Sequence, residues 1–245
     1  MDITNQMSSL EELHFFDVTK SKICFPNEPL NITKLNVTDC KLDNFNRLDN
    51  LANLKELKLG SINDGLKDFS FLKPMRKLEK LNISTTDISD FSSFPVLETL
   101  KEFRLTGGFT GSDVKDVEFL KDYRNLRVVD LSNNILIYLD GLQNLKELEE
   151  LNLSNNRTFD ISSLANLKNL KILNLNDNRV HDLSPLSELN KLETLELFGN
   201  QVTDISPLLN LENLGKANLS ANKIEDKKQE AIINRLISRG VNVMY

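Results

Sequence analysis

The sequence has few cysteines and no long apolar run. Its two cysteines, Cys24 and Cys40, form no C-x-x-C pair among 245 residues. Two thiols are too few for the disulfide framework that staples small secreted domains. No apolar segment approaches the roughly 18 residues that a membrane-spanning helix requires. The sequence therefore predicts a soluble protein that has its own hydrophobic core and no membrane insertion.

Basic residues are not in excess either. The chain carries 30 Lys and Arg against 36 Asp and Glu, a formal net charge of −6 at pH 7. Phosphate backbones and anionic membrane surfaces attract basic stripes, so this balance argues against nucleic acid or a membrane as the partner. Residues 1–10 lack the basic and apolar regions of a signal peptide. The expected location is the cytoplasm, or outside the cell after export without a visible signal.

The sequence is dominated by a repeat. Five stretches align without a gap, each starting 22 residues after the one before: Leu126–Asn134, Leu148–Asn156, Leu170–Asn178, Leu192–Asn200 and Leu214–Asn222. Their shared pattern has leucine at the first and sixth positions and asparagine at the ninth. A fixed period of roughly 20–29 residues with L-x-x-L-x-L-x-x-N is the signature of a leucine-rich-repeat solenoid.

The same frame continues upstream with irregularities. Five earlier repeats start at Leu10, Ile32, Leu54, Leu78 and Leu100, and the third and fifth of these carry insertions. None has asparagine at the ninth position, which is occupied by Val18, Cys40, Ile62, Thr86 and Gly108. We therefore expect a less regular asparagine ladder in the N-terminal half. At its position, Cys40 is expected to be a buried structural thiol.

The repeat predicts its own local structure. Each L-x-L core is a strand of about three residues whose leucines point inward. The ninth-position asparagine can bond backbone groups that would otherwise be buried and unpaired. The return segments Asp182–Leu186 and Asp204–Leu208 contain Ser-Pro, which fits the N-cap and first position of a short helical turn. Only about ten residues remain for each return, so 3₁₀ turns are expected there.

The C-terminal segment departs from the repeat. Residues 226–239 carry Ala231, Ile232, Leu236 and Ile237 at helical spacing, and Val241–Val243 alternates like a terminal strand. A helix and an edge strand would close the end of a solenoid. The predicted domains are an N-terminal cap at 1–31, the solenoid at 32–222 and a C-terminal cap at 223–245. The predicted fold class is α/β: a right-handed, horseshoe-shaped solenoid whose parallel concave sheet has about eleven strands, with 3₁₀ or single-turn segments on its convex side.

The 22-residue unit resembles the short class of leucine-rich repeats. That class is typical of bacterial internalins and of the phosphatase-1 regulatory repeat subunit. Residues 178–192 and 200–214 look most like the internalin variant, because they contain Asp-(Leu/Ile)-Ser-Pro-Leu. The resemblance covers about residues 32–222, and it implies a protein partner bound on the concave face. The sequence shows no wall-sorting motif or immunoglobulin-like region of the internalin kind, which argues against a surface-anchored adhesin.

Candidates for chemistry are scarce. The only histidines, His14 and His181, lie seven repeats apart, or roughly 30 Å at the usual strand spacing, so they cannot share a site. The glycine-rich run at 107–111 lacks the Gly-Lys-Ser/Thr of a phosphate loop. We therefore expect no catalytic residue, cofactor or metal site. An enzyme or nucleotide-binding protein with an unrecognised site is the alternative hypothesis.

The outward strand positions are where a partner would bind. Val128, Ile172 and Phe198 are apolar on a face where solvation favours polar groups, which suggests a contact patch. Isolated exposed apolar residues are also common, so the patch competes with that simpler explanation. The Gly107–Asp113 insertion is a second candidate contact, or neutral drift in a surface loop. The predicted partner-binding residues are Arg104, Phe109, Val128, Asp130, Ile172, Glu196 and Phe198. The favoured hypothesis is a monomeric protein-interaction scaffold, with a bacterial effector or adaptor as one form of it.

Overall fold

The computed structural model describes residues 10–18, 22–23, 30–42, 48, 50–61, 68–84, 90–107, 114–224 and 227–245. The chain forms two compact units, Met1–Asp113 and Val114–Tyr245, called the first and second unit below. The boundary falls at the end of the insertion predicted at Gly107–Asp113. Phe109 and most of that insertion lie outside the described residues, so its predicted projection is not tested.

The first unit contains five parallel strands in chain order. They are β1 (Glu12–Phe16), β3 (Lys34–Thr38), β5 (Glu56–Gly60), β6 (Lys80–Ser84) and β7 (Glu102–Thr106). A separate pair of two-residue strands, β2 (Lys22–Ile23) and β4 (Lys41–Leu42), lies beside them. A 3₁₀ turn covers Ser70–Leu72. Neighbouring strands pair without slippage, so equivalent repeat positions stand opposite one another.

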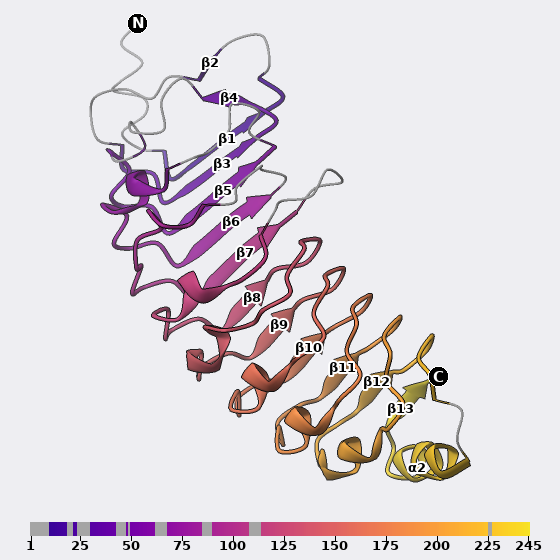
Figure 1. Cartoon of the computed structure of the whole chain (residues 1–245). Coiled ribbons are helices and arrows are strands. Elements are labelled where there is room, and N and C mark those ends of the chain that lie inside the picture. The colour runs from indigo at the N-terminus through magenta and orange to yellow at the C-terminus, as the bar shows by residue number, and fades with distance from the viewer. Residues whose placement is uncertain are drawn as a thin grey trace, which may run out of the picture. The chain divides into compact units, whose positions relative to one another are not determined.

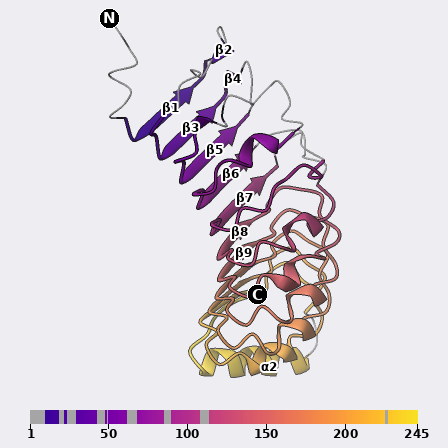
Figure 2. The same cartoon turned by 90° about the vertical axis from the view of Figure 1, so that its left-hand side faces the viewer.

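The second unit repeats the same arrangement more regularly. Its parallel strands are β8 (Val128–Asp130), β9 (Glu150–Asn152), β10 (Ile172–Asn174), β11 (Thr194–Glu196), β12 (Lys216–Asn218) and β13 (Asn242–Met244). Return segments form 3₁₀ turns at Glu118–Leu120, Leu142–Asn144, Ser162–Leu164, Ser184–Leu186 and Ser206–Asn210. Figure 2 shows strands β8 and β9 along one side of this unit and the helical turns along the other. The predicted leucine-rich-repeat fold and its 3₁₀ returns are confirmed.

Leucines form the core of the second unit, as the repeat predicts. Leu131, Leu153, Leu175 and Leu197 are at most 1% exposed. Their amides donate to the fifth-position carbonyl of the following repeat at 2.8 Å in each case, so the four residues occupy one row. Each large side chain buried in this way contributes about 1.5–3 kcal/mol to folding. Burial therefore recurs once per repeat, along the whole unit.

The ninth-position asparagines form a ladder of hydrogen bonds in the second unit. Asn156, for example, donates from Nδ2 to Leu131 O and Leu153 O, both at 2.9 Å, and its Oδ1 accepts the Leu136 amide. Each rung thus joins its own repeat to the preceding one. The same bonds are made by Asn178, Asn200 and Asn222, and Asn134 bonds carbonyls of its own repeat. The predicted ladder is confirmed.

Strand length differs between the two units, and so do the bonds made at the fifth repeat position. The repeat strands have five residues in the first unit but three in the second. In four repeats of the second unit the fifth-position side chain accepts the seventh-position amide, as Asn152 Oδ1 does from Ser154 N at 3.1 Å, and Glu196 is the exception. In the first unit pairing continues through the seventh position, and Cys40, at a ninth position, is a buried thiol that donates to Thr38 O.

The eighth repeat position has a left-handed backbone, which the sequence analysis did not identify. Its φ angles lie between 48° and 69° at Asp17, Asp39, Ser61, Asn133, Asn155, Asp177, Gly199 and Ala221. Asparagine, aspartate and glycine adopt this conformation most readily, because other residues bring Cβ against the following carbonyl. Most repeats place one of these three residues here. Among the eight residues named above, Ser61 and Ala221 are the exceptions.

The capping of the return turns differs from the prediction. Serine was expected at the N-cap, but each 3₁₀ turn with Ser-Pro begins at the serine and carries proline second. The aspartate two residues earlier caps the turn instead: Asp182 Oδ1 accepts the Ser184 amide at 2.8 Å and its Oδ2 accepts the Ser184 hydroxyl. Asp204 does the same for Ser206, and this backbone bond holds the pKa of Asp204 below its ordinary value. An aspartate supplies the oxygen because the serine hydroxyl is itself a donor here.

A helix and a strand follow the last repeat as expected, at Lys227–Ser238 and Asn242–Met244, but the strand lies one residue later than predicted and the helix buries a different face. Helix α2 (Lys227–Ser238) buries Gln229, Ile232, Ile233 and Leu236, whereas Ala231 and Ile237 are exposed. At about 3.6 residues per turn the four buried residues fall in one stripe about 100° wide. Ala231 and Ile237 fall outside it, so their predicted role in covering the core is wrong. Gln229 completes the contact by accepting the Ile205 amide at 2.9 Å.

We predict that Asn178→Ala destabilises the protein by about 3 kcal/mol, because one substitution removes four hydrogen bonds and leaves the Thr158 amide buried and unpaired. Urea unfolding measures the change. The matched control is Asn166→Ala, which removes an exposed amide in the preceding repeat and should cost less than about 0.5 kcal/mol. Equal effects of the two variants would show that the ladder adds nothing to stability.

We predict that Ala221→Gly stabilises the protein by about 0.5–1 kcal/mol, because glycine accepts a φ of 57° without the steric penalty that alanine carries. The same substitution at Ala231, exposed on α2, should instead destabilise by about 1 kcal/mol. Thermal unfolding of both variants compares the two signs. A loss of stability in Ala221→Gly contradicts the assignment of backbone strain.

We predict that Leu236→Ala lowers stability by about 3 kcal/mol, since Leu236 is fully buried against the last repeat. Ile237→Ala should change it by less than about 1 kcal/mol, because Ile237 is 46% exposed. Calorimetric unfolding distinguishes the two neighbours. A larger loss in Ile237→Ala would restore the helix face predicted from sequence.

Candidate partner-binding surface

The outward side chains of β8–β12 make the sheet face of the second unit, called the second-unit face below. Two large apolar residues are exposed on it: Ile172 at 40% and Phe198 at 41%. Val128 is half-buried. Strands β8 and β10 hold Val128 and Ile172, whereas Phe198 lies in the turn just after β11.

Strand register shows how far apart these residues stand. Val128 and Ile172 share the third-position row, but Glu150 stands between them on β9. Two strand spacings of about 4.8 Å separate their Cα atoms by roughly 10 Å. Phe198 belongs to the seventh-position row, where its amide donates to Asn176 Oδ1 at 2.8 Å. The three residues are thus separate apolar points within a polar face.

The predicted charged residues already have structural bonds. Asp130 Oδ1 accepts the Ser132 amide at 3.0 Å, which is the usual fifth-position bond of this unit. Glu196 pairs with Lys216 on β12 at 2.5 Å and its side chain is only 17% exposed. Arg104 lies on β7 of the first unit and is half-buried. Asp130 and Glu196 therefore make bonds within the second-unit face and are also candidate contacts for a partner.

A second charge cluster borders the same strands. Glu149 lies between Lys171, at 2.7 Å, and Arg127, at 3.7 Å. The hydrogen bond from Lys171 holds the pKa of Glu149 below its ordinary value. Exposed pairs of this kind contribute little to folding stability. They do fix the positions of charges that a partner would meet.

Sequence reasoning missed an aromatic surface on the return side. Tyr138 is 57% exposed and Phe159 is 46% exposed. Phe159 lines a cavity of about 250 Å³ together with His181, Pro185, Ile161 and two aspartates. The available signal was positional, because Tyr138 occupies the repeat position that aspartate fills at Asp160, Asp182 and Asp204. Only the outward strand positions had been compared.

Metal sites and membrane-spanning helices were both predicted to be absent, and the described residues can be searched for each. They contain no group of three or more His, Cys, Asp or Glu side chains placed to hold a metal ion. They also contain no helix both long and apolar enough to cross a membrane. His14 lies in the first unit and His181 in the second.

Comparison with known proteins identifies the fold. Residues 147–188 match the family described as Leucine Rich repeats (2 copies). Among solved structures from Listeria monocytogenes, internalin F is 26% identical with a TM-score of 0.78, covering 87% of this chain and 61% of its own. Internalin C2 is 28% identical with a TM-score of 0.66, covering 82% of each chain. A complex of TLR13 with ssRNA13 is 28% identical with a TM-score of 0.62, covering 77% of this chain and 29% of the receptor.

No curated protein sequence matches the chain. The repeat, the asparagine ladder and these structures agree, so the chain is a leucine-rich-repeat protein similar to the internalins. It spans about 61% of the length of the internalin F chain.

Proposed function

We propose that this chain is a scaffold that binds a protein partner on the second-unit face. The observation that carries the proposal is the exposure of Ile172 on β10 and of Phe198 just after β11, on a face whose other outward residues are mostly polar. Folding alone gives no reason to place large apolar side chains there, because neither contributes to the core. A partner would remove both from water on binding.

The surroundings of these two residues suit a protein interface. Interface hot spots are typically a few large side chains surrounded by polar groups that exclude water. Around Ile172 and Phe198 the ion pairs Lys171–Glu149 and Lys216–Glu196 supply charges of both signs at defined positions. Such charges mainly set orientation and association rate. We therefore assign Ile172 and Phe198 the affinity and the ion pairs the specificity.

The similar structures support a binding role and leave the partner open. The internalins come from a bacterium, which supports a bacterial effector or adaptor as the biological setting. The TLR13 complex contains RNA, so the fold itself accommodates nucleic acid. With a net charge of −6 this chain lacks the overall basic charge that favours phosphate backbones, and a protein remains the favoured partner.

Site-specific photo-crosslinking is the experiment that tests the proposal. A photoreactive phenylalanine analogue replaces Phe198 in one variant and Phe159 in another, because the two phenylalanines have similar exposures of 41% and 46% but lie on the sheet face and the return side. We expect a protein crosslinked in lysate through position 198 and not through position 159. Once that protein is isolated, its affinity for the chain can be measured.

We predict that Ile172→Ser with Phe198→Ser weakens binding of the crosslinked partner at least about tenfold, as loss of central apolar contacts usually does. Melting temperature should be unchanged, because both side chains are outside the core. Phe159→Ser is the matched control and should bind normally. Unchanged affinity in the double variant would overturn the proposal, as would turnover or nucleotide binding without any protein partner.

A further inference from the structure

The sheet face of the first unit carries its charges in two rows. The third-position row reads Glu12, Lys34, Glu56, Lys80 and Glu102 across the five paired strands. Its members compensate one another: Glu12 pairs with Lys34 at 2.5 Å and Lys80 with Glu102 at 2.6 Å. Glu56 stands in register between Lys34 and Lys80. This row is close to neutral.

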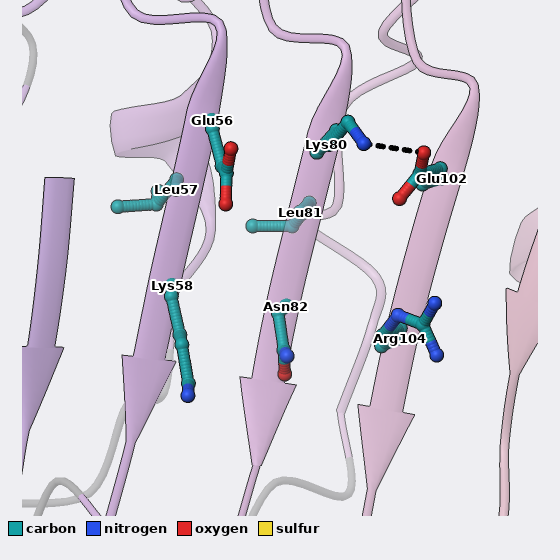
Figure 3. Close-up of a pocket in the computed structure, with 8 residues that line it drawn as sticks. All are labelled: Glu56, Leu57, Lys58, Lys80, Leu81, Asn82, Glu102 and Arg104. Carbon is teal, nitrogen blue, oxygen red and sulfur yellow. Dashed lines mark ion pairs between the residues drawn. The ribbon is translucent and has the colours of Figure 1, made fainter. Parts of the chain in front are cut away.

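The fifth-position row is different, because it contains no acid. Across the same strands it reads His14, Asn36, Lys58, Asn82 and Arg104. Figure 3 shows Lys58, Asn82 and Arg104 side by side on β5, β6 and β7, with the Lys80–Glu102 pair one row away. Lys58 has no hydrogen-bond or ion-pair partner among the described residues. A row of an otherwise acidic protein therefore presents positive charge.

Asn82 adds an unsatisfied group to this row. Its Oδ1 is buried and accepts no hydrogen bond from the described residues. Asparagines at the same repeat position elsewhere are satisfied: Asn36 Oδ1 accepts the Thr38 hydroxyl at 2.8 Å and Asn152 Oδ1 accepts the Ser154 amide. Buried acceptors are nearly always paired, so an unpaired one beside a pocket points to a donor supplied by a ligand, which the oxygen meets once the amide rotates toward the pocket.

The three side chains share one pocket. Lys58, Asn82 and Arg104 line a cavity of about 70 Å³, several times the roughly 10–15 Å³ that one water molecule requires. Glu56, Lys80 and Glu102 complete its charged wall and Leu57 and Leu81 its floor. The space is large enough for a carboxylate group.

We propose that this pocket binds an acidic side chain of an extended peptide. The Asp or Glu carboxylate lies at the Lys58 ammonium, on the side walled by Arg104, and a peptide N–H donates to Asn82 Oδ1. A fully ionised phosphate monoester offers oxygens for Lys58 but no donor for Asn82, so it matches the pocket less well. The site belongs to the first unit and does not depend on the second-unit face.

The test uses the full chain and synthetic probes. Fluorescein-labelled hexaglutamate is titrated by fluorescence anisotropy, with labelled hexaglutamine as the uncharged probe and inorganic phosphate as a competitor. The net charge of −6 opposes unspecific binding of hexaglutamate, so saturable binding requires a local basic site. We expect saturable binding of hexaglutamate alone, with weak competition from phosphate. Undetectable hexaglutamate binding, or complete displacement by equimolar phosphate, overturns the proposal.

Two variants locate the site. Lys58→Gln should weaken hexaglutamate binding at least fivefold, whereas Lys55→Gln, the same charge change in the same repeat but outside the pocket lining, should change it less than twofold. Asn82→Leu should weaken binding at least threefold without lowering the melting temperature, because the amide oxygen that it removes has no partner among the described residues. Equal losses in the two lysine variants, or unchanged affinity in Asn82→Leu, would contradict the proposed site.

Discussion

The side-chain amide of the ninth-position asparagine is the constraint on which the second unit depends. Each such amide from Asn156 to Asn222 spans two repeats, because its Nδ2 bonds carbonyls of both and its Oδ1 takes a backbone amide of the preceding one. Buried backbone groups must be paired, and the strands pair only three residues of each 22-residue repeat. Without the ladder, the chain leaving each strand would have no partner in the interior. The short strands, the left-handed eighth position and the close return turns are all consistent with this one bond pattern.

Much of this fold could be predicted from the sequence, because the same pattern of residues recurs in repeat after repeat. The 22-residue period predicted which leucines point inward, and the ninth-position asparagines from Asn134 to Asn222 predicted the ladder. Details with a weaker signal were missed. The left-handed eighth position is filled by Asn, Asp, Gly, Ser or Ala, so no single residue type marks it. The choice of Ile233 over Ile237 in α2 depends on how the helix lies against the last repeat, which helical spacing alone cannot specify. The capping residue was predicted to be serine and not aspartate because both residues occur together in the Asp-x-Ser segments, and the sequence does not show which of them supplies the accepting oxygen.

The candidate site was less predictable than the fold, for a physical reason. Packing constrains the inward residues of a repeat to similar apolar side chains. The outward residues are free to vary, so each must be interpreted by itself. The apolar residues Val128, Ile172 and Phe198 are equivalent in the sequence pattern. In the structure, however, Val128 is half-buried and the other two are exposed. Asp130 and Glu196 share one repeat position but bond differently, one to a backbone amide and the other to a lysine. Exposure and partners depend on neighbours one repeat away, and no single-repeat pattern contains that information.

Asn82 shows how a repeat scaffold can acquire a binding group through loss of an internal bond. Asn152 and Asn82 occupy the same repeat position and have the same chemistry. In the second unit the strand ends early, so the seventh-position amide is available to the asparagine oxygen. In the first unit the strands run two residues further and pairing extends to Ser84. There Asn36 Oδ1 accepts the Thr38 hydroxyl, whereas Asn82 Oδ1 is buried and has no donor among the described residues. The bonding of this amide therefore depends on its neighbours and not on residue type alone, and among the described residues the unsatisfied asparagine oxygen lies in the less regular unit.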